Sequence, residues 1–145
     1  MSEENKALVR RAYDGFSEGS VEVLDEVFAP DYVAHFPGIE PIVGRDAAKR
    51  LVGAFIDAFP DIKFTIEDQI AEGDRVVARW TAQGTHKGEF RGFPPMMHGV
   101  APTGRHVRFT ATDIYRIVDG LIAEEWNSLE QLDVMQQIGA IAVPD

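Results

Sequence analysis

The sequence contains no cysteine among its 145 residues, which excludes disulfide bonds and thiol chemistry. It also has no run of about 18 apolar residues, roughly the length that a helix needs to cross a bilayer. Residues 1–6 are polar and lack the apolar segment of a secretory signal. These absences predict a cytoplasmic protein with no membrane partner.

Basic residues are scarce as well. The chain has 14 Lys and Arg against 24 Asp and Glu, a net charge of −10. A surface that binds nucleic acid is cationic, so we expect no nucleic-acid partner. Segment 75–116 is the exception, with seven basic and two acidic side chains. This pattern is typical of solvated strand faces, and the alternative is attraction of an anionic substrate.

The motifs of common cofactor and metal sites are missing. There is no G-x-S-x-G, no P-loop and no dinucleotide fingerprint. The four histidines, His35, His86, His98 and His106, do not have the spacing of metal ligands. The sequence therefore predicts neither a cofactor nor a metal.

The N-terminal part has apolar residues at helical spacing. Such stripes run through residues 8–16, 21–28 and 46–59 and predict three helices. Gly19 is placed to end the first of them, as glycine commonly does at helix C-termini. After Pro60 the pattern changes to the two-residue alternation of strands.

Alternation predicts a set of strands and one more helix in the second half of the chain. The expected elements are strands at 64–70, 76–86, 107–118 and 121–127, a turn at Asp119-Gly120, and a helix within 129–138. A short extended segment is expected earlier, at 32–36. Helices first and antiparallel strands after them predict the α+β class. We expect residues 1–145 to form one domain, in which three N-terminal helices pack on a strongly curved, mainly antiparallel sheet. This sheet would be a cone-shaped barrel with an internal pocket, followed by a short C-terminal helix.

Asp113 is the most informative residue. It lies in the middle of an alternating apolar face formed by Val107, Phe109, Ala111, Tyr115 and Ile117. A carboxylate in an apolar layer is costly unless it is paired, hydrogen-bonded or protonated. We therefore predict that Asp113 acts as an acid or hydrogen-bond donor. The alternatives are a bulge that turns it outward, or a structural hydrogen bond in the core.

Two histidines are candidates for the same site. His35 is a candidate general base, because an unperturbed histidine titrates near pH 6.5; otherwise it is a surface or packing residue. His86 lies at the end of a predicted strand, where a pocket rim is expected, and is either a polar positioner or a residue without a chemical role.

Five aromatic residues are candidates for the substrate-binding wall of the pocket, with the hydrophobic core as the alternative for each: Tyr13, Phe55, Phe59, Trp80 and Trp126. The loop segment 93–97 is either a lid over the pocket or a surface loop.

The length of the hairpin turn determines which residue faces Asp113. A two-residue turn at Asp119-Gly120 pairs Asp113 with Trp126. A three-residue turn with a bulge pairs Asp113 with Asn127 instead. The residues alone permit both.

Several short motifs resemble the SnoaL-like polyketide cyclases, a family of the nuclear-transport-factor-2-like superfamily. They are AFPD at 58–61, AEGDRVV at 71–77, GTH at 84–86, PTGR at 102–105 and RIVDG at 116–120. The resemblance covers nearly the whole chain. It implies cofactor-free acid–base chemistry on a small apolar organic substrate, a homodimer, and an Asn127 side chain that faces the pocket.

Comparison with the family by position shows departures. The catalytic aspartate of the cyclases falls at Asn127, and at Asp113 they tend to have histidine. Related epoxide hydrolases would need an arginine in place of Ala111 and an aspartate in place of Asn127. Ketosteroid isomerase has, at the position of Asp113, the aspartate that donates a hydrogen bond. Its general base corresponds to a position close to His35, and its active-site tyrosine corresponds to the position before Tyr13.

We therefore expect an enzyme that abstracts a proton next to a carbonyl group and drives isomerisation, cyclisation or elimination. Asp113 would be the acid or hydrogen-bond donor and His35 the base, with His86 and Asn127 as polar positioners. The first alternative is a ligand-binding or interaction domain without turnover. The second is a hydrolase in which Asp113 and Asn127 hold a water molecule.

Overall fold

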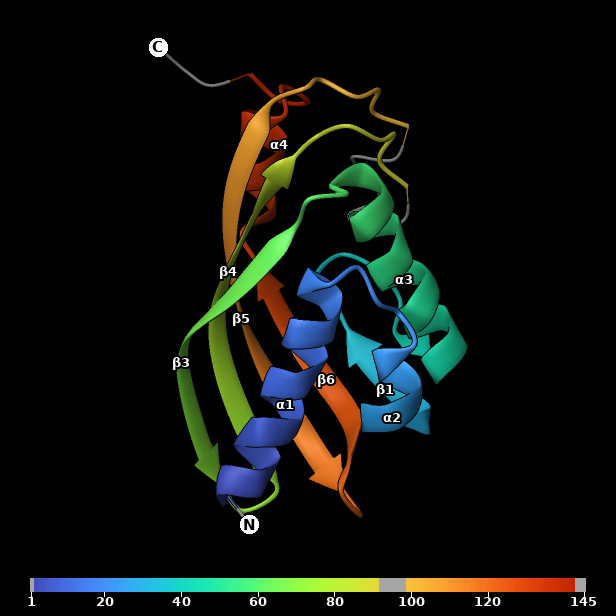
Figure 1. Ribbon diagram of the computed structural model, residues 1–145, viewed down its shortest axis with the longest axis vertical. Helices are drawn as coiled ribbons and strands as arrows, with labels where there is room; N and C mark the ends of the chain where they lie inside the picture. Colours follow the sequence, from blue (N-terminus) through green and yellow to red (C-terminus); the bar gives the residue numbers. More distant parts are fainter. Residues whose placement is uncertain (1, 92–98, 143–145) are drawn as a thin grey trace.

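The computed structural model describes residues 2–91 and 99–142 (Figure 1). Its N-terminal part is helical, as predicted, with α1 (Ser2–Ser17), α2 (Val23–Val27) and α3 (Arg45–Ala58). Gly19 ends α1 with a φ of 77°, and the amide of Ser20 donates to the carbonyl of Gly15, which is the glycine-terminated cap expected from the sequence. Gly15 also permits close packing of α2, because a Cβ there would lie 2.6 Å from Val23.

The six strands form one sheet in the order β2-β1-β6-β5-β4-β3. Their bounds are β1 Phe28–His35, β2 Ile42–Val43, β3 Lys63–Glu72, β4 Arg75–Thr85, β5 His106–Val118 and β6 Leu121–Leu129. Every neighbouring pair is antiparallel except β1 and β6, which are parallel. The helix α4 (Gln131–Gln137) follows. The curved, mostly antiparallel sheet with its N-terminal helices and short C-terminal helix confirms the α+β prediction.

The helices place the site on one side of the sheet. Figure 1 shows α1 crossing the sheet and α3 standing opposite it. α1 packs on β3 and β4, and α3 packs on β1. None of the four helices in the described residues has the length and hydropathy of a membrane-spanning helix.

The segment from Phe28 to His35 differs from the prediction. The sequence placed Phe28 on a helical stripe and began the extended segment at Tyr32, whereas the structure continues β1 through all of it. Val27 and Phe28 are buried and fit either a helix or a strand, so spacing alone does not separate the two. The register of β1 against β6 shifts between Phe28 and Val33, around Pro30, which has no amide hydrogen to donate.

The β5–β6 hairpin combines the two alternatives that the sequence left open. Its turn has two residues, Asp119 and Gly120, with φ of 51° and 75°, as a type I′ turn requires. The register then shifts between Ile117 and Arg116, so that Ala123 is the extra residue of a bulge. Beyond this bulge Asp113 pairs with Asn127. Because side chains alternate along a strand, the bulge decides which residues of β6 face the pocket.

The outer face of the sheet has a row of four apolar residues and one histidine that crosses five strands. Ile70 pairs with Val77, Val77 with Ile114, Ile114 with Trp126, and Trp126 with His35. Ile70 and Ile114 are 65% and 39% exposed. We call these five residues the outer row.

Candidate active site

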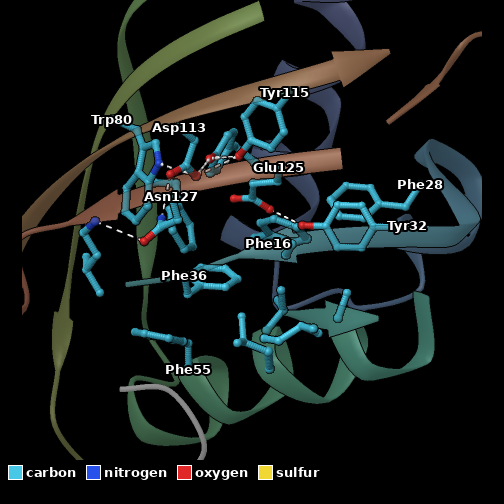
Figure 2. A pocket seen from close by; sticks show the side chains of 18 of the residues that line it. Phe16, Phe28, Tyr32, Phe36, Phe55, Trp80, Asp113, Tyr115, Glu125 and Asn127 are labelled. Atoms are coloured by element: carbon cyan, nitrogen blue, oxygen red, sulfur yellow. Dashed lines mark hydrogen bonds between the residues drawn. The ribbon is translucent and has the colours of Figure 1, made fainter. Parts of the chain in front are cut away.

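A pocket lies between the inner face of the sheet and the helices. Ten of its twenty lining residues are aromatic, and its polar groups are few, which is typical of a small-molecule site. Figure 2 shows Asp113, Glu125 and Asn127 together on the strands, with Phe55 on the α3 side across from them. We call the end that contains these three residues the polar end.

Asp113 is 1% exposed and accepts hydrogen bonds at both oxygens. The hydroxyls of Tyr13 and Tyr115 each lie 3.0 Å from Oδ2 and also bond each other, so one of their two protons is left to donate to Oδ2. Nε1 of Trp80 donates to the same oxygen at 3.2 Å. Nδ2 of Asn127 donates to Oδ1 at 2.6 Å. A carboxylate only accepts hydrogen bonds, so this set of donors fits its ionised form.

The neighbouring strand fixes the orientation of the Asn127 amide. The backbone N–H of Leu129 donates to Oδ1 of Asn127 at 3.0 Å. Because that N–H can only donate, the amide NH₂ of Asn127 must point at Asp113. Asn127 therefore faces the pocket as a hydrogen-bond donor.

Glu125 is a second buried carboxyl of the pocket, and the sequence interpretation missed it. It is 7% exposed and accepts a hydrogen bond from the hydroxyl of Tyr32. Burial raises the pKa of Glu125 well above its usual 4.5, and the nearby charge of Asp113 raises it further. The signal was available, since a strand that turns Asn127 inward also turns inward the residue two positions earlier.

All three tyrosines of the chain line this pocket. Tyr13 and Tyr115 share a hydrogen bond through their hydroxyls, and Tyr32 bonds Glu125. Burial raises the pKa of each hydroxyl well above 10.0, and the charges of Asp113 and Glu125 add to the effect. All three hydroxyls are therefore neutral donors at neutral pH.

His35 and Trp126 do not line the pocket, contrary to the sequence interpretation. Ala34 lines it, so the next residue of the strand points to the outer face. Nε2 of His35 lies 2.7 Å from Oε2 of Glu124, and its ring stacks on Trp126 with centroids 5.5 Å apart. Trp126 also faces outward and lies under the guanidinium of Arg75 at 4.9 Å. This geometry does not bring His35 toward Asp113.

His86 and Phe59 are core residues rather than pocket residues. The chain after β4 folds over the end of α3, where the amide of Lys87 donates to the carbonyl of Ala58 at 3.0 Å, and this buries His86 completely. Its Nδ1 accepts the N–H of Thr103 at 3.3 Å, and its ring packs on Phe59. Burial lowers the pKa of His86. The expected rim position is therefore wrong.

The structure does bring five of the predicted residues to the pocket: Tyr13, Phe55, Trp80, Asp113 and Asn127. No Lys, Arg or His is among the lining residues. Within the basic segment, Arg75, Arg79 and Arg116 lie on the outer face, where Arg75 and Arg79 are exposed. They are therefore solvated strand-face residues and not part of this pocket.

Two further expectations concern the loop and metals. The proposed lid, residues 93–97, lies outside the described residues. Within the part of the chain that the structure describes, no group of three or more His, Asp or Glu side chains is arranged to hold a metal ion.

Comparison with known proteins places this pocket in a family. The profile of the SnoaL-like polyketide cyclases matches residues 7–138. The chain belongs to the SnoaL-like polyketide cyclase family. The match confirms the resemblance of the short motifs, and it covers every residue of the polar end.

Solved structures agree with this assignment. IdmH from Streptomyces antibioticus, a proposed polyketide cyclase, is 31% identical over 93% of this chain and 98% of its own, with a TM-score of 0.77. AclR from Streptomyces galilaeus, a proposed hydroxylase, is 26% identical over 100% of this chain and 87% of its own, with a TM-score of 0.85. A SnoaL-like protein from Jannaschia sp. CCS1 has the same fold at 24% identity, with a TM-score of 0.84, over 99% of this chain and 95% of its own. A comparison with curated proteins gave no match.

Proposed function

We propose that this SnoaL-like protein is a cofactor-independent enzyme that moves protons on a small, apolar carbonyl compound. The observation that carries this proposal is the pair of buried carboxyls, Asp113 and Glu125, at the polar end of an aromatic pocket. When two carboxyls share a buried site, one of them holds its proton more tightly than the other does. The carboxyl that keeps its proton can act as the acid, and the ionised one can act as the base.

Asp113 is the base in this proposal. Three donors favour its ionised form, and Oδ1 accepts the bond from Asn127, which leaves it a lone pair for a proton. Glu125 is the acid, because its raised pKa favours the protonated form. The acid role expected of Asp113 from the sequence thus passes to Glu125.

The proposed step conserves protons and electrons. Oδ1 of Asp113 takes a proton from the carbon next to the carbonyl, and the C–H electron pair becomes a C=C bond. The carbonyl electron pair moves onto oxygen, which receives a hydrogen bond or the proton of Glu125. In a substrate with a second C=C bond conjugated to the new one, Asp113 returns its proton to the far carbon, the C=O bond re-forms, and Glu125 recovers any proton it gave to the oxygen, which completes an isomerisation. The apolar walls exclude water, so these donors act in a low dielectric.

The test is exchange of the acidic C–H protons of 2-tetralone, a cyclic aryl ketone, in D₂O by proton NMR. Wild-type protein should accelerate the exchange above the buffer rate. Glu125→Gln and Asp113→Asn should each reduce the acceleration by roughly 10²-fold or more, the usual size of a general acid–base contribution. Glu124→Gln is the matched control, because Glu124 is the neighbouring glutamate on the outer face, and it should retain the wild-type rate.

The rival proposal is a binding domain without turnover, and the aspartate missing at position 127 favours it. Binding of 2-tetralone without exchange above the buffer rate would support this rival. Equal exchange in the wild type and in both carboxyl variants would contradict the proposed mechanism.

We also propose that a second copy of the chain covers the outer row. The charges beside this row are paired within the chain, Arg79 with Asp68 at 3.6 Å and Arg116 with Glu124 at 3.1 Å. Four of the five residues of the row are apolar and its flanks are neutralised, which suits an identical row better than a charged partner.

Sedimentation equilibrium tests this homodimer. Ile114→Glu should shift the wild-type dimer to a monomer, because it buries a charge in the interface. Ile141→Glu is the control, since Ile141 is equally exposed at 38% against 39% for Ile114 but lies outside the row. A monomeric wild type would overturn this proposal.

A further inference from the structure

The negative charge at the polar end has no cationic partner among the described residues. Every hydrogen-bond donor to Asp113 is a neutral group, a hydroxyl, an indole N–H or an amide. By contrast, Glu124 on the outer face is paired with both His35 and Arg116. The fold thus gives a cationic partner to the more exposed glutamate and none to the buried aspartate.

A buried carboxylate without a counter-charge is unusual. Proteins pair such charges because the cost of removing an ion from water is only partly offset by neutral dipoles. Asp113 lines the pocket, so a ligand that enters it can supply the missing charge. A ligand that is itself an anion would instead add like-charge repulsion at short range.

The walls around this carboxylate also favour a positive charge. The rings of Tyr13, Trp80 and Tyr115 surround Asp113, with Tyr13 lying 5.7 Å from Trp80 and 6.4 Å from Tyr115 between ring centroids. Phe64 completes the group at 5.2 Å from Trp80. Faces of aromatic rings attract cations, and the attraction is stronger where water is excluded. The aromatic rings are an observation independent of the carboxyl pair, and both favour the same ligand charge.

We infer that the pocket takes an apolar, ring-containing ligand that carries a protonated amine, with the ammonium group seated at the polar end beside Asp113. A substrate of the proposed reaction would then be an amino ketone, in which the positive charge also stabilises the negative oxygen that forms. This inference rests on the ionised Asp113 of the proposed function but does not require turnover.

Three probes that share one ring system and differ in charge test the inference by calorimetry. They are 2-naphthylmethylamine, 2-naphthylmethanol and 2-naphthoic acid. The amine should bind roughly tenfold or more tightly than the alcohol, and the acid roughly tenfold or more weakly, as expected for a charge at short range in an aromatic site. Val52→Trp, which fills the pocket from α3, should abolish binding of all three.

Two variants assign the preference to the carboxyl. Asp113→Asn should make the Kd values of the amine and the alcohol equal, whereas Glu124→Gln should leave the tenfold difference intact. If Asp113→Asn does not fold, the three wild-type affinities still decide the matter. Equal binding of the amine and the alcohol, or binding of the acid as tight as that of the alcohol, would overturn the inference.

The outcome is separable from that of the proposed function. Proton exchange in 2-tetralone without a preference for the amine would refute the inference and leave the reaction standing. A preference for the amine without proton exchange would refute the proposed reaction and leave the inference standing.

Discussion

Glu124 and Glu125 are neighbours in the chain, yet they lie on opposite faces of the sheet and their pKa values shift in opposite directions. Glu124, which faces outward, bonds His35 and Arg116, and these partners lower its pKa below 4.5. Glu125 faces the pocket, and burial raises its pKa well above the same value. The bulge at Ala123 decides which of the two carboxyls enters the pocket.

The stability of the protein should depend on pH through Glu125. Its raised folded-state pKa means that the native state binds the proton more tightly than the unfolded state. This contribution is fully present below the unfolded value near 4.5 and is lost as pH rises through the folded value. The loss is about 1.4 kcal/mol for each unit by which the folded pKa exceeds the unfolded one.

Glu125→Gln should remove that loss, because glutamine mimics the neutral carboxyl and still accepts the bond from Tyr32. Urea unfolding over a pH series that runs from below 4.5 upward measures it, and the variant should gain on the wild type as pH rises above 4.5. In the control Glu124→Gln, stability relative to the wild type should instead improve as pH falls below 4.5, because the contribution of the lowered pKa of Glu124 is full above 4.5 and is lost as pH falls through its folded value. Parallel curves for Glu125→Gln and the wild type would contradict the assignment.

Asp113→Asn should lower the free energy of unfolding by about 1–3 kcal/mol at neutral pH. The carboxylate meets donors on both oxygens, so an amide NH₂ in its place faces another donor. Asp119→Asn is the matched control, because Asp119 is an exposed turn residue with a positive φ that asparagine also adopts. A change within 0.5 kcal/mol is expected there, as is usual for surface sites. Equal urea midpoints for the two variants would exclude the network described for Asp113.

Asn127→Asp places a third carboxyl against Asp113 and removes the donor at 2.6 Å. We expect a loss of roughly 3–5 kcal/mol at neutral pH, the usual result of an unpaired buried charge. The new carboxyl has a raised pKa, so the lost stability should return as pH falls and the group takes a proton. Thermal unfolding at several pH values measures this, with Ser128→Asp, which adds the same charge on the exposed side, as the control.

The three tyrosines should remain protonated in the folded protein at a pH where free tyrosine ionises. Burial raises the pKa of Tyr13, Tyr32 and Tyr115 above 10.0. Ultraviolet absorbance of tyrosinate should therefore appear only together with the loss of native circular dichroism. Ionisation of even one tyrosine near pH 10 with the fold intact would show that the pocket is wetter than described.

The sequence predicted the parts of the site that depend on simple periodicity. Alternation along 107–118 put Asp113, Phe109 and Tyr115 on one face, and the structure has them there. The residues alone left the register of β6 open, because the bulge residue, Ala123, is an ordinary alanine with no turn signal, and Glu125 follows only once Asn127 is taken to face inward. His35 was predicted to be the general base from its chemistry alone, because the sequence does not show which strand pairs with residues 32–36 and therefore which way the His35 side chain points. The parallel pairing of β1 with β6, a contact between residues some 90 positions apart, turns it outward.

The pKa of the Glu125 side chain, measured by carbon NMR with Glu125→Gln to assign its signal, tests the account most directly. Glu124 in the same spectra is the internal reference. We expect Glu125 to titrate well above 4.5 and Glu124 below it. If Glu125 titrates at or below 4.5, the pocket has no proton donor of this kind and the acid–base account is contradicted.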